Sequence, residues 1–202
     1  MDGFSINSEV PPEYRKVKWL ADIFVVGMGA GWVVHYVLMV YTSIKHQTYC
    51  LNIMPSATPS EWHHSPLVAQ NGPLIFMATT ALWVCGQFAV TMQLGPPLAY
   101  TWGAIVCQLL ISVGQVCQLL NRNSTRGASY SLWLSRFFGS TSTIGFWTLR
   151  YLYWPEAFSW LGEPILIWAI AVFFASEFTY GYCFYRIQYQ ENLSHGSECK
   201  RK

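Results

Sequence analysis

Charged residues are scarce in this chain, and aspartate is the scarcest of them. Only 11% of the 202 residues are charged, against about 25% in soluble domains, and the two aspartates are Asp2 and Asp22. An aspartate-rich magnesium site for a diphosphate group is therefore excluded. The net charge of +2 is too small for a nucleic-acid-binding surface, and the basic residues lie at the ends of apolar segments.

Signals for metal sites and disulfides are also missing. No cysteine belongs to a CxxC pair or to a Cys/His spacing suited to a metal, and four lie in apolar stretches, where we interpret them as small hydrophobic residues: Cys85, Cys107, Cys117 and Cys183. The adjacent His63 and His64 would point apart on any regular element, so we interpret them as solvated loop residues. The sequence predicts no metal and no cofactor.

Long apolar runs dominate the chain instead. Hydrophobic residues make up 52% of it and aromatic residues 17%. A helix of about 20 apolar residues crosses a hydrocarbon core of about 30 Å. The sequence predicts an all-α, integral membrane helical bundle with about five transmembrane helices, at 19–41, 74–94, 99–120, 130–153 and 164–186. A polar leader at 1–18, a loop at 42–73 and a polar tail at 187–202 complete the expected organisation.

The distribution of basic residues predicts the orientation in the membrane. Five spans place the two termini on opposite sides, and most basic residues lie on the side of the C-terminus. By the positive-inside rule, we expect the C-terminus to be cytoplasmic. The glycosylation sequons at Asn123 and Asn192 would then face the cytosol and stay unmodified. The expected location is the endoplasmic reticulum, as a multi-pass protein.

Small residues in the first run predict a close helix contact. Gly27 and Gly31 have the GxxxG spacing that lets two membrane helices approach closely. A nucleotide-binding glycine motif is excluded because no strand precedes these glycines and no βαβ unit follows.

Glu177, near the middle of the last apolar run, is the candidate catalytic residue. An acid at that depth costs about 2.5 kcal/mol or more to insert, so it should face a partner, a cavity or a reaction. On a helix it shares its face with residues three, four or seven positions away, namely Phe173, Phe174, Tyr180, Gly181 and Phe184. Burial disfavours the charged form of a carboxyl group. A protonated Glu177 could therefore deliver a proton to an apolar substrate, and the aromatic rings could stabilise a carbocation. The alternative catalytic role is that of the base that quenches the final cation.

A structural role for Glu177 stays open on the sequence alone. The carboxylate could pair with Arg136 and hold helices together inside the bundle. For the other ionisable residues of the spans we expect structural roles. Asp22 is expected in the first turn of its helix, where it complements the helix dipole, and His35 is expected to be a hydrogen-bonded packing residue.

Ordered motifs along most of the chain resemble a known family. They are Pro11-Pro12-Glu13-Tyr14-Arg15, Ala21 to Gly29, Ser65-Pro66-Leu67-Val68, Trp102 to Leu110, Ser124 to Tyr130, Leu132 to Phe137 and Tyr153 to Phe158. On these motifs the chain resembles the fungal membrane-bound terpene cyclases of meroterpenoid and indole-diterpene biosynthesis, the paxB family, with its greatest likeness to the farnesyl-meroterpenoid branch.

The resemblance implies a particular reaction and particular partners. Such an enzyme protonates the terminal epoxide of a farnesyl-aromatic or polyketide-derived substrate and guides a polyene cyclisation without a metal. The implied partners are this hydrophobic prenylated substrate, the lipid bilayer and other membrane enzymes of the pathway, and no nucleic acid.

The resemblance also implies two acids, of which this chain has one. Glu177, three residues before Tyr180-Gly181, matches the acid of the family's last span, which is usually aspartate. The acid of the family's second span has no counterpart. Between Met54-Pro55 and Glu61 the family pattern implies about 45 absent residues, equal to two of seven spans. The alternative to an active enzyme is a catalytically impaired, truncated relative that acts as a non-enzymatic membrane protein.

Overall fold

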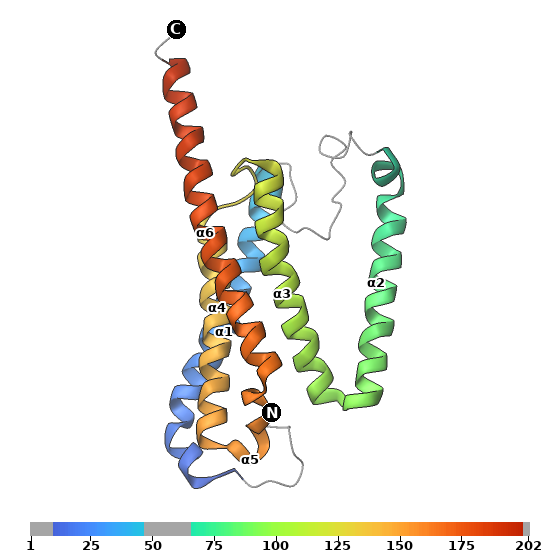
Figure 1. Ribbon diagram of the computed structural model, residues 1–202, viewed down its shortest axis with the longest axis vertical. Coiled ribbons are helices and arrows are strands. Elements are labelled where there is room, and N and C mark those ends of the chain that lie inside the picture. Colours follow the sequence, from blue (N-terminus) through green and yellow to red (C-terminus); the bar gives the residue numbers. More distant parts are fainter. Residues whose placement is uncertain (1–9, 47–65, 200–202) are drawn as a thin grey trace. The chain divides into compact units, whose positions relative to one another are not determined.

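The structure is a computed structural model, and it describes residues 10–46 and 66–199. These residues form helices and no strand (Figure 1). The elements are α1 (Pro12–His46), α2 (Pro66–Leu94), α3 (Pro96–Arg122), α4 (Tyr130–Tyr153), α5 (Pro155–Phe158), the 3-10 helix η1 (Ser159–Gly162) and α6 (Pro164–Cys199). The predicted all-α class is confirmed.

Proline marks the start of most helices. The helices α1, α2, α3, α5 and α6 each begin at a proline. The first residue of a helix has no intrahelical partner for its N–H group, so proline loses no hydrogen bond there. Between α2 and α3 the turn passes through Gly95, whose φ of 81° suits glycine. Helix α3 ends at Asn123, which adopts the left-handed conformation and donates its N–H to the Leu119 carbonyl at 3.0 Å.

Four helices within the described ranges are long and apolar enough to cross a membrane. They cover Pro12–Lys45, Gln70–Leu94, Pro96–Arg122 and Pro164–Leu193. In the most apolar 18-residue window of the second span, no residue is buried within the protein. Apolar side chains exposed in this way fit a lipid environment, because lipid tails are as apolar as the side chains themselves.

The fifth expected span, α4, is a helix with the predicted bounds but is not among these four. Its 24 residues are about 36 Å long, enough to cross a bilayer. Its sequence is less apolar because it contains two arginines and many hydroxyl side chains. Several of these polar residues are buried, namely Arg136, Ser140, Ser142 and Arg150. Polar residues in membrane helices are expected to face the protein interior in this way.

Other helix ends differ from the predicted boundaries. Helix α1 begins inside the expected leader, α2 begins at Pro66 and passes through Pro73, and α6 continues through the polar tail to Cys199. Apolar runs locate the part of a helix in the hydrocarbon core, whereas polar turns at either end extend it into water. The expected loop residues His63 and His64 lie outside the described residues.

The chain divides into two compact units, each of which contains distant segments of the sequence. The first comprises residues 1–40 and 130–171, with most of α1, all of α4, α5 and η1, and the start of α6. The second comprises residues 41–129 and 172–202, with α2, α3 and the greater part of α6.

Glycines bring α1 and α4 together in the first unit. A Cβ atom added at Gly31 would lie 2.6 Å from the Cα of Gly139, and one added at Gly27 would lie 2.9 Å from Oγ of Ser142. The contact predicted from the Gly27/Gly31 spacing is confirmed. His35, one turn beyond Gly31, is buried and its Nδ1 lies 3.0 Å from the Leu132 carbonyl oxygen, which confirms its packing role.

Asp22 has a different structural partner from the expected one. Because α1 begins at Pro12, Asp22 lies well beyond the first turn, and its interpretation as a partner of the helix dipole was wrong. Its carboxylate instead forms an exposed ion pair with Lys18 at 2.9 Å, one turn earlier in the helix. Such i, i+4 pairs stabilise a helix by about 0.3–0.5 kcal/mol.

Candidate active site

Glu177 lies on a continuous buried stripe of α6. The buried residues of this helix recur every three or four positions, which places them on one face: Leu166, Ala169, Phe173, Glu177, Tyr180, Phe184 and Ile187. Glu177 is the acid among them and its exposed fraction is 0%. The predicted combination of a buried acid with Phe173, Tyr180 and Phe184 is therefore present, while Phe174 and Gly181 lie at the half-buried edge of the stripe.

Aromatic rings pack against one another on both sides of Glu177 along the helix. The Phe173 and Phe174 rings meet edge to face with centroids 5.1 Å apart, and Phe174 stacks on Phe178 at 6.0 Å. One turn beyond the acid, Tyr180 stacks on Phe184 at 6.0 Å. These contacts limit the rotamers of the rings, so the aromatic side chains before and after Glu177 on α6 are ordered.

Two polar residues of α3 connect to the carboxyl group of Glu177. The Ser112 hydroxyl donates a hydrogen bond to Oε1 of Glu177 at 2.7 Å. The Gln108 amide Nε2 donates to the Ser112 hydroxyl oxygen at 2.9 Å. Helices α3 and α6 thus contribute a hydrogen-bonded chain that runs from an amide through a hydroxyl to a buried acid.

The sequence reasoning missed Ser112 and Gln108, although a signal for them exists. Gln108, Ser112 and Gln115 are spaced by four and three residues in an otherwise apolar span, which places them on one face of α3. Polar residues with helical spacing inside a span indicate the face that packs against protein. The pattern identifies the face of α3 but not which residue of another helix it meets.

A second carboxylate, Glu191, holds the connection after α3. Its Oε1 accepts hydrogen bonds from the Ser124 hydroxyl at 2.8 Å and from the Thr125 backbone N–H at 3.0 Å. The Thr125 hydroxyl donates to the other carboxylate oxygen. This cluster ties the segment after Asn123 to the last turns of α6. Helix α6 thus contacts α3 at Glu177 and the connection that follows α3 at Glu191.

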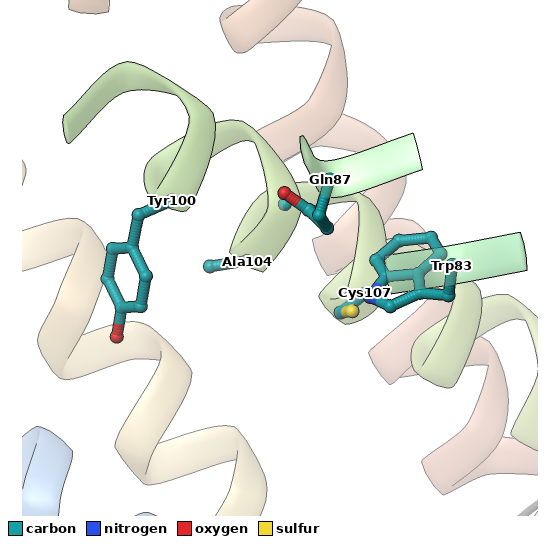
Figure 2. Close-up of a pocket in the computed structure, with 6 residues that line it drawn as sticks. Trp83, Gln87, Tyr100, Ala104 and Cys107 are labelled. Atoms are coloured by element: carbon teal, nitrogen blue, oxygen red, sulfur yellow. The ribbon is translucent and has the colours of Figure 1, made fainter. Parts of the chain in front are cut away.

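A hollow between α2 and α3 lies apart from Glu177. Figure 2 shows Trp83 and Gln87 of α2 beside Tyr100, Ala104 and Cys107 of α3. Gly103 completes the lining, and the volume of the hollow is about 290 Å³. A Cβ atom at Gly103 would lie 2.2 Å from the Gln87 amide nitrogen, so glycine leaves the space that this side chain fills. No acid is among the residues that line the hollow.

Three other ionisable residues, in α4 and in the connection between α4 and α6, are described by their burial. Arg136 is fully buried in the first unit, and Glu156 and Glu163 are exposed at the ends of α5 and η1. Within residues 10–46 and 66–199, no group of three or more His, Cys, Asp or Glu side chains is arranged to hold a metal ion.

The fold and the site together define a helical membrane protein whose second unit contains a hydrogen-bonded acid buried among aromatic side chains. A sequence profile of the Pyr4-like transmembrane terpene cyclases matches residues 5–59 and 55–190. The chain is 44% identical to the terpene cyclase atmB of Aspergillus flavus and 45% identical to the terpene cyclase janB of Penicillium janthinellum, with 99% of each chain covered. It is 44% identical to the terpene cyclase paxB of Penicillium paxilli, with 95% of both chains covered. No solved structure matches.

The chain belongs to the Pyr4-like transmembrane terpene cyclases, and by this similarity it is a membrane-bound terpene cyclase. The family expected from the sequence motifs is confirmed.

The alignments also show an internal difference in length. The match to atmB extends over 242 positions, whereas this chain has 202 residues, so at least 40 aligned positions have no residue here. The two segments matched by the family profile meet at residues 55–59. This is the place where the sequence motifs of the family break, between α1 and α2.

Proposed function

We propose that Glu177 is the acid that starts the cyclisation. The observation that carries the proposal is the geometry of Glu177, which is fully buried, hydrogen-bonded to Ser112 and flanked along α6 by Phe173 and Tyr180. An acid shielded from water keeps its proton for the substrate, and aromatic faces attract the positive charge that follows proton transfer. The match of Glu177 to the acid of the family's last span supports the same role.

The proposed reaction is an isomerisation. The proton of the Glu177 carboxyl group moves to the oxygen of a terminal epoxide, and one C–O bond breaks to leave a hydroxyl group and a carbocation. Alkene π electrons then form the new C–C bonds in sequence. The last cation loses one proton, and a proton returns to the Glu177 carboxylate to regenerate the acid. Substrate and product therefore have the same formula, and no cofactor is consumed.

The proposed substrate is an epoxidised prenyl chain attached to an aromatic or polyketide-derived group. Membrane spans and aromatic side chains offer this chain an apolar environment, and the named relatives are terpene cyclases. The farnesyl chain expected from the resemblance is tested by supplying farnesyl and geranylgeranyl epoxides in parallel.

The test of Glu177 is the substitution Glu177→Gln in membranes that contain the protein and the epoxide substrate. The amide keeps the shape of the side chain but has no acidic proton. We expect turnover to fall about 100-fold or more, because general acid catalysis contributes about 10²–10⁴-fold. Glu177→Asp keeps the acid and should retain measurable turnover, while Glu163→Gln removes an exposed acid outside the site and should leave turnover unchanged.

The same variants distinguish catalysis from a structural role. If Glu177 only holds helices together, by pairing with Arg136 or otherwise, Glu177→Gln will lower the amount of folded protein and leave the turnover of each folded molecule unchanged. That result would overturn the proposal. Folded protein is measured by size-exclusion chromatography in detergent, so that turnover is expressed per folded molecule.

The Glu177→Gln test can be repeated in a second protein, in which the aligned positions missing from this chain are restored. A chimera that carries the corresponding segment of atmB between α1 and α2 restores the family length. We expect cyclised product from the 202-residue chain and from the chimera, with the Glu177→Gln effect in both. Product from neither, with both proteins folded in the membrane, would refute the proposed substrate class.

We also propose that the enzyme resides in the endoplasmic reticulum and works beside other membrane enzymes of its pathway. An integral membrane protein that uses a water-insoluble substrate gains from receiving it within the same bilayer. Co-localisation of a fluorescent fusion with a marker of that membrane tests the location, and a signal confined to another membrane would contradict it.

A further inference from the structure

We propose that Ser112 is a positioning residue for Glu177, and that Gln108 sets the direction in which the Ser112 hydroxyl donates. This inference rests on the proposed role of Glu177 as the acid. It adds that the acidic proton of Glu177 resides on Oε2, because Oε1 is occupied as an acceptor.

The geometry of the three groups carries the inference. The Ser112 hydroxyl lies 2.7 Å from Oε1 of Glu177, and the Gln108 Nε2 lies 2.9 Å from the Ser112 oxygen. Ser112 is 1% exposed and Glu177 is 0% exposed. Water does not compete at such a site, so the hydrogen bonds between α3 and α6 determine how the carboxyl group is oriented.

The donors and acceptors in this chain have one order. An amide N–H group only donates, so Gln108 uses a lone pair of the Ser112 oxygen and leaves the Ser112 proton to be donated onward. That proton goes to Oε1 of Glu177. In a protonated carboxyl group the carbonyl oxygen is the stronger acceptor, so this order assigns the proton to the other oxygen, Oε2.

This arrangement serves the reaction in two ways. The terminal torsion of a glutamate side chain has a broad range, so anchoring Oε1 also fixes the direction in which Oε2 presents its proton. After the proton has left, the Ser112 hydroxyl already points at the oxygen that shares the negative charge. The charge develops only during the reaction, so the bond should affect kcat more than KM.

The test is a set of substitutions at Ser112. We expect Ser112→Ala to lower kcat about 10- to 100-fold with KM almost unchanged, since a hydrogen bond to a charged group contributes about 1.5–3 kcal/mol. Ser112→Thr restores a hydroxyl and should recover most of the lost kcat. Ser112→Cys keeps a donor at the same position, although the thiol is larger and donates more weakly, and its kcat should be intermediate. Ser176→Ala is the matched control, because it removes a half-buried hydroxyl next to Glu177 in α6.

A double-mutant cycle tests the role assigned to Gln108. Gln108→Leu should lower kcat in the native protein and have no further effect on kcat in the Ser112→Ala variant, because the proposed effect of Gln108 on Glu177 passes through the serine. The effects of substituting contacting residues in one hydrogen-bonded network are expected to be non-additive in this way. Equal effects of Gln108→Leu in both backgrounds would overturn its role.

Failure of this inference can be told apart from failure of the proposed function. If Glu177→Gln abolishes turnover while Ser112→Ala keeps the native kcat, the positioning role is overturned and the acid stands. An effect on KM alone, or no rescue by threonine or cysteine in folded protein, also overturns it. If Glu177→Gln retains native turnover, the proposed function itself has failed.

Discussion

Gly31 is the position where the contact between α1 and α4 is most sensitive to added volume. The substitution Gly31→Ala places a methyl group 2.6 Å from Cα and 2.7 Å from the backbone nitrogen of Gly139, and 2.9 Å from the Ser135 carbonyl oxygen. All three neighbours are backbone atoms, which cannot rotate away as the end of a side chain can. Gly29, two residues earlier, has nothing within 4 Å of the place that an added methyl group would occupy, and it provides the matched control, Gly29→Ala.

The magnitude follows from two opposing effects. Ordinary contacts of a Cβ atom begin at 3.4 Å, so the helices must separate by close to 0.8 Å at Gly31. Overpacking of this kind costs about 1–3 kcal/mol. Replacement of glycine by alanine in a helix gains about 1 kcal/mol, and this gain applies to both variants. We therefore expect Gly31→Ala to be less stable than Gly29→Ala by about 1–3 kcal/mol, or roughly a factor of 5 to 150 in the unfolding equilibrium.

The measurement is unfolding of the detergent-solubilised protein, followed by helical circular dichroism during titration with sodium dodecyl sulfate. The curves of the two alanine variants are compared with that of the native protein. Gly29→Ala should unfold at or above the native midpoint and Gly31→Ala below it. Identical curves for the two variants would show that α1 and α4 do not approach each other this closely.

Two further predictions concern contacts outside the candidate site. Glu191→Ala removes the hydrogen-bond acceptor for Ser124 and Thr125, so trypsin should cleave after the exposed Arg126 about tenfold faster. This magnitude follows from about 1.5–3 kcal/mol for a hydrogen bond to a charged group. An unchanged cleavage rate would show that the carboxylate does not hold this segment. Arg150→Met removes a buried guanidinium group whose Cζ lies 4.2 Å and 4.8 Å from the centroids of two phenylalanine rings. The substitution should lower the free energy of unfolding by about 0.5–2 kcal/mol. Unfolding in detergent measures this change, and an unfolding midpoint equal to the native one would count against the stacking.

Local sequence patterns predicted those features of the fold that a single helix determines. The apolar run at 130–153 has the bounds of α4, and the spacing around Glu177 placed Phe173, Tyr180 and Phe184 on its face. Helix ends were predicted less well. Hydropathy changes where a helix leaves the hydrocarbon core, but the helix continues in polar turns and no further change in hydropathy marks its last residue. The interpretation of Asp22 failed for this reason, since it depended on where α1 begins.

Contacts between helices could be predicted only in part. Glycine spacing identified a small face at Gly27 and Gly31, and the face was correct, although the partner Gly139 carries no signal of its own. The bond from Ser112 to Glu177 joins residues 65 positions apart. Helical spacing predicts that each residue faces inward, but the depth at which α3 meets α6 depends on the packing of the whole unit, which no local pattern encodes.

The position of the internal length difference bears on the chemistry. Gln108, Ser112 and Glu177 all lie in the second segment matched by the family profile, after the junction at residues 55–59. The missing aligned positions therefore fall between α1 and α2 and remove no part of the hydrogen-bonded chain around the acid. The resemblance implies that the missing positions form two spans, and loss of an even number of spans would leave the later helices with their original orientation in the membrane. The hydrogen-bonded chain around Glu177 is thus independent of the missing positions. What these positions can alter is the second-span acid that the family resemblance implies, and the enclosure of the substrate.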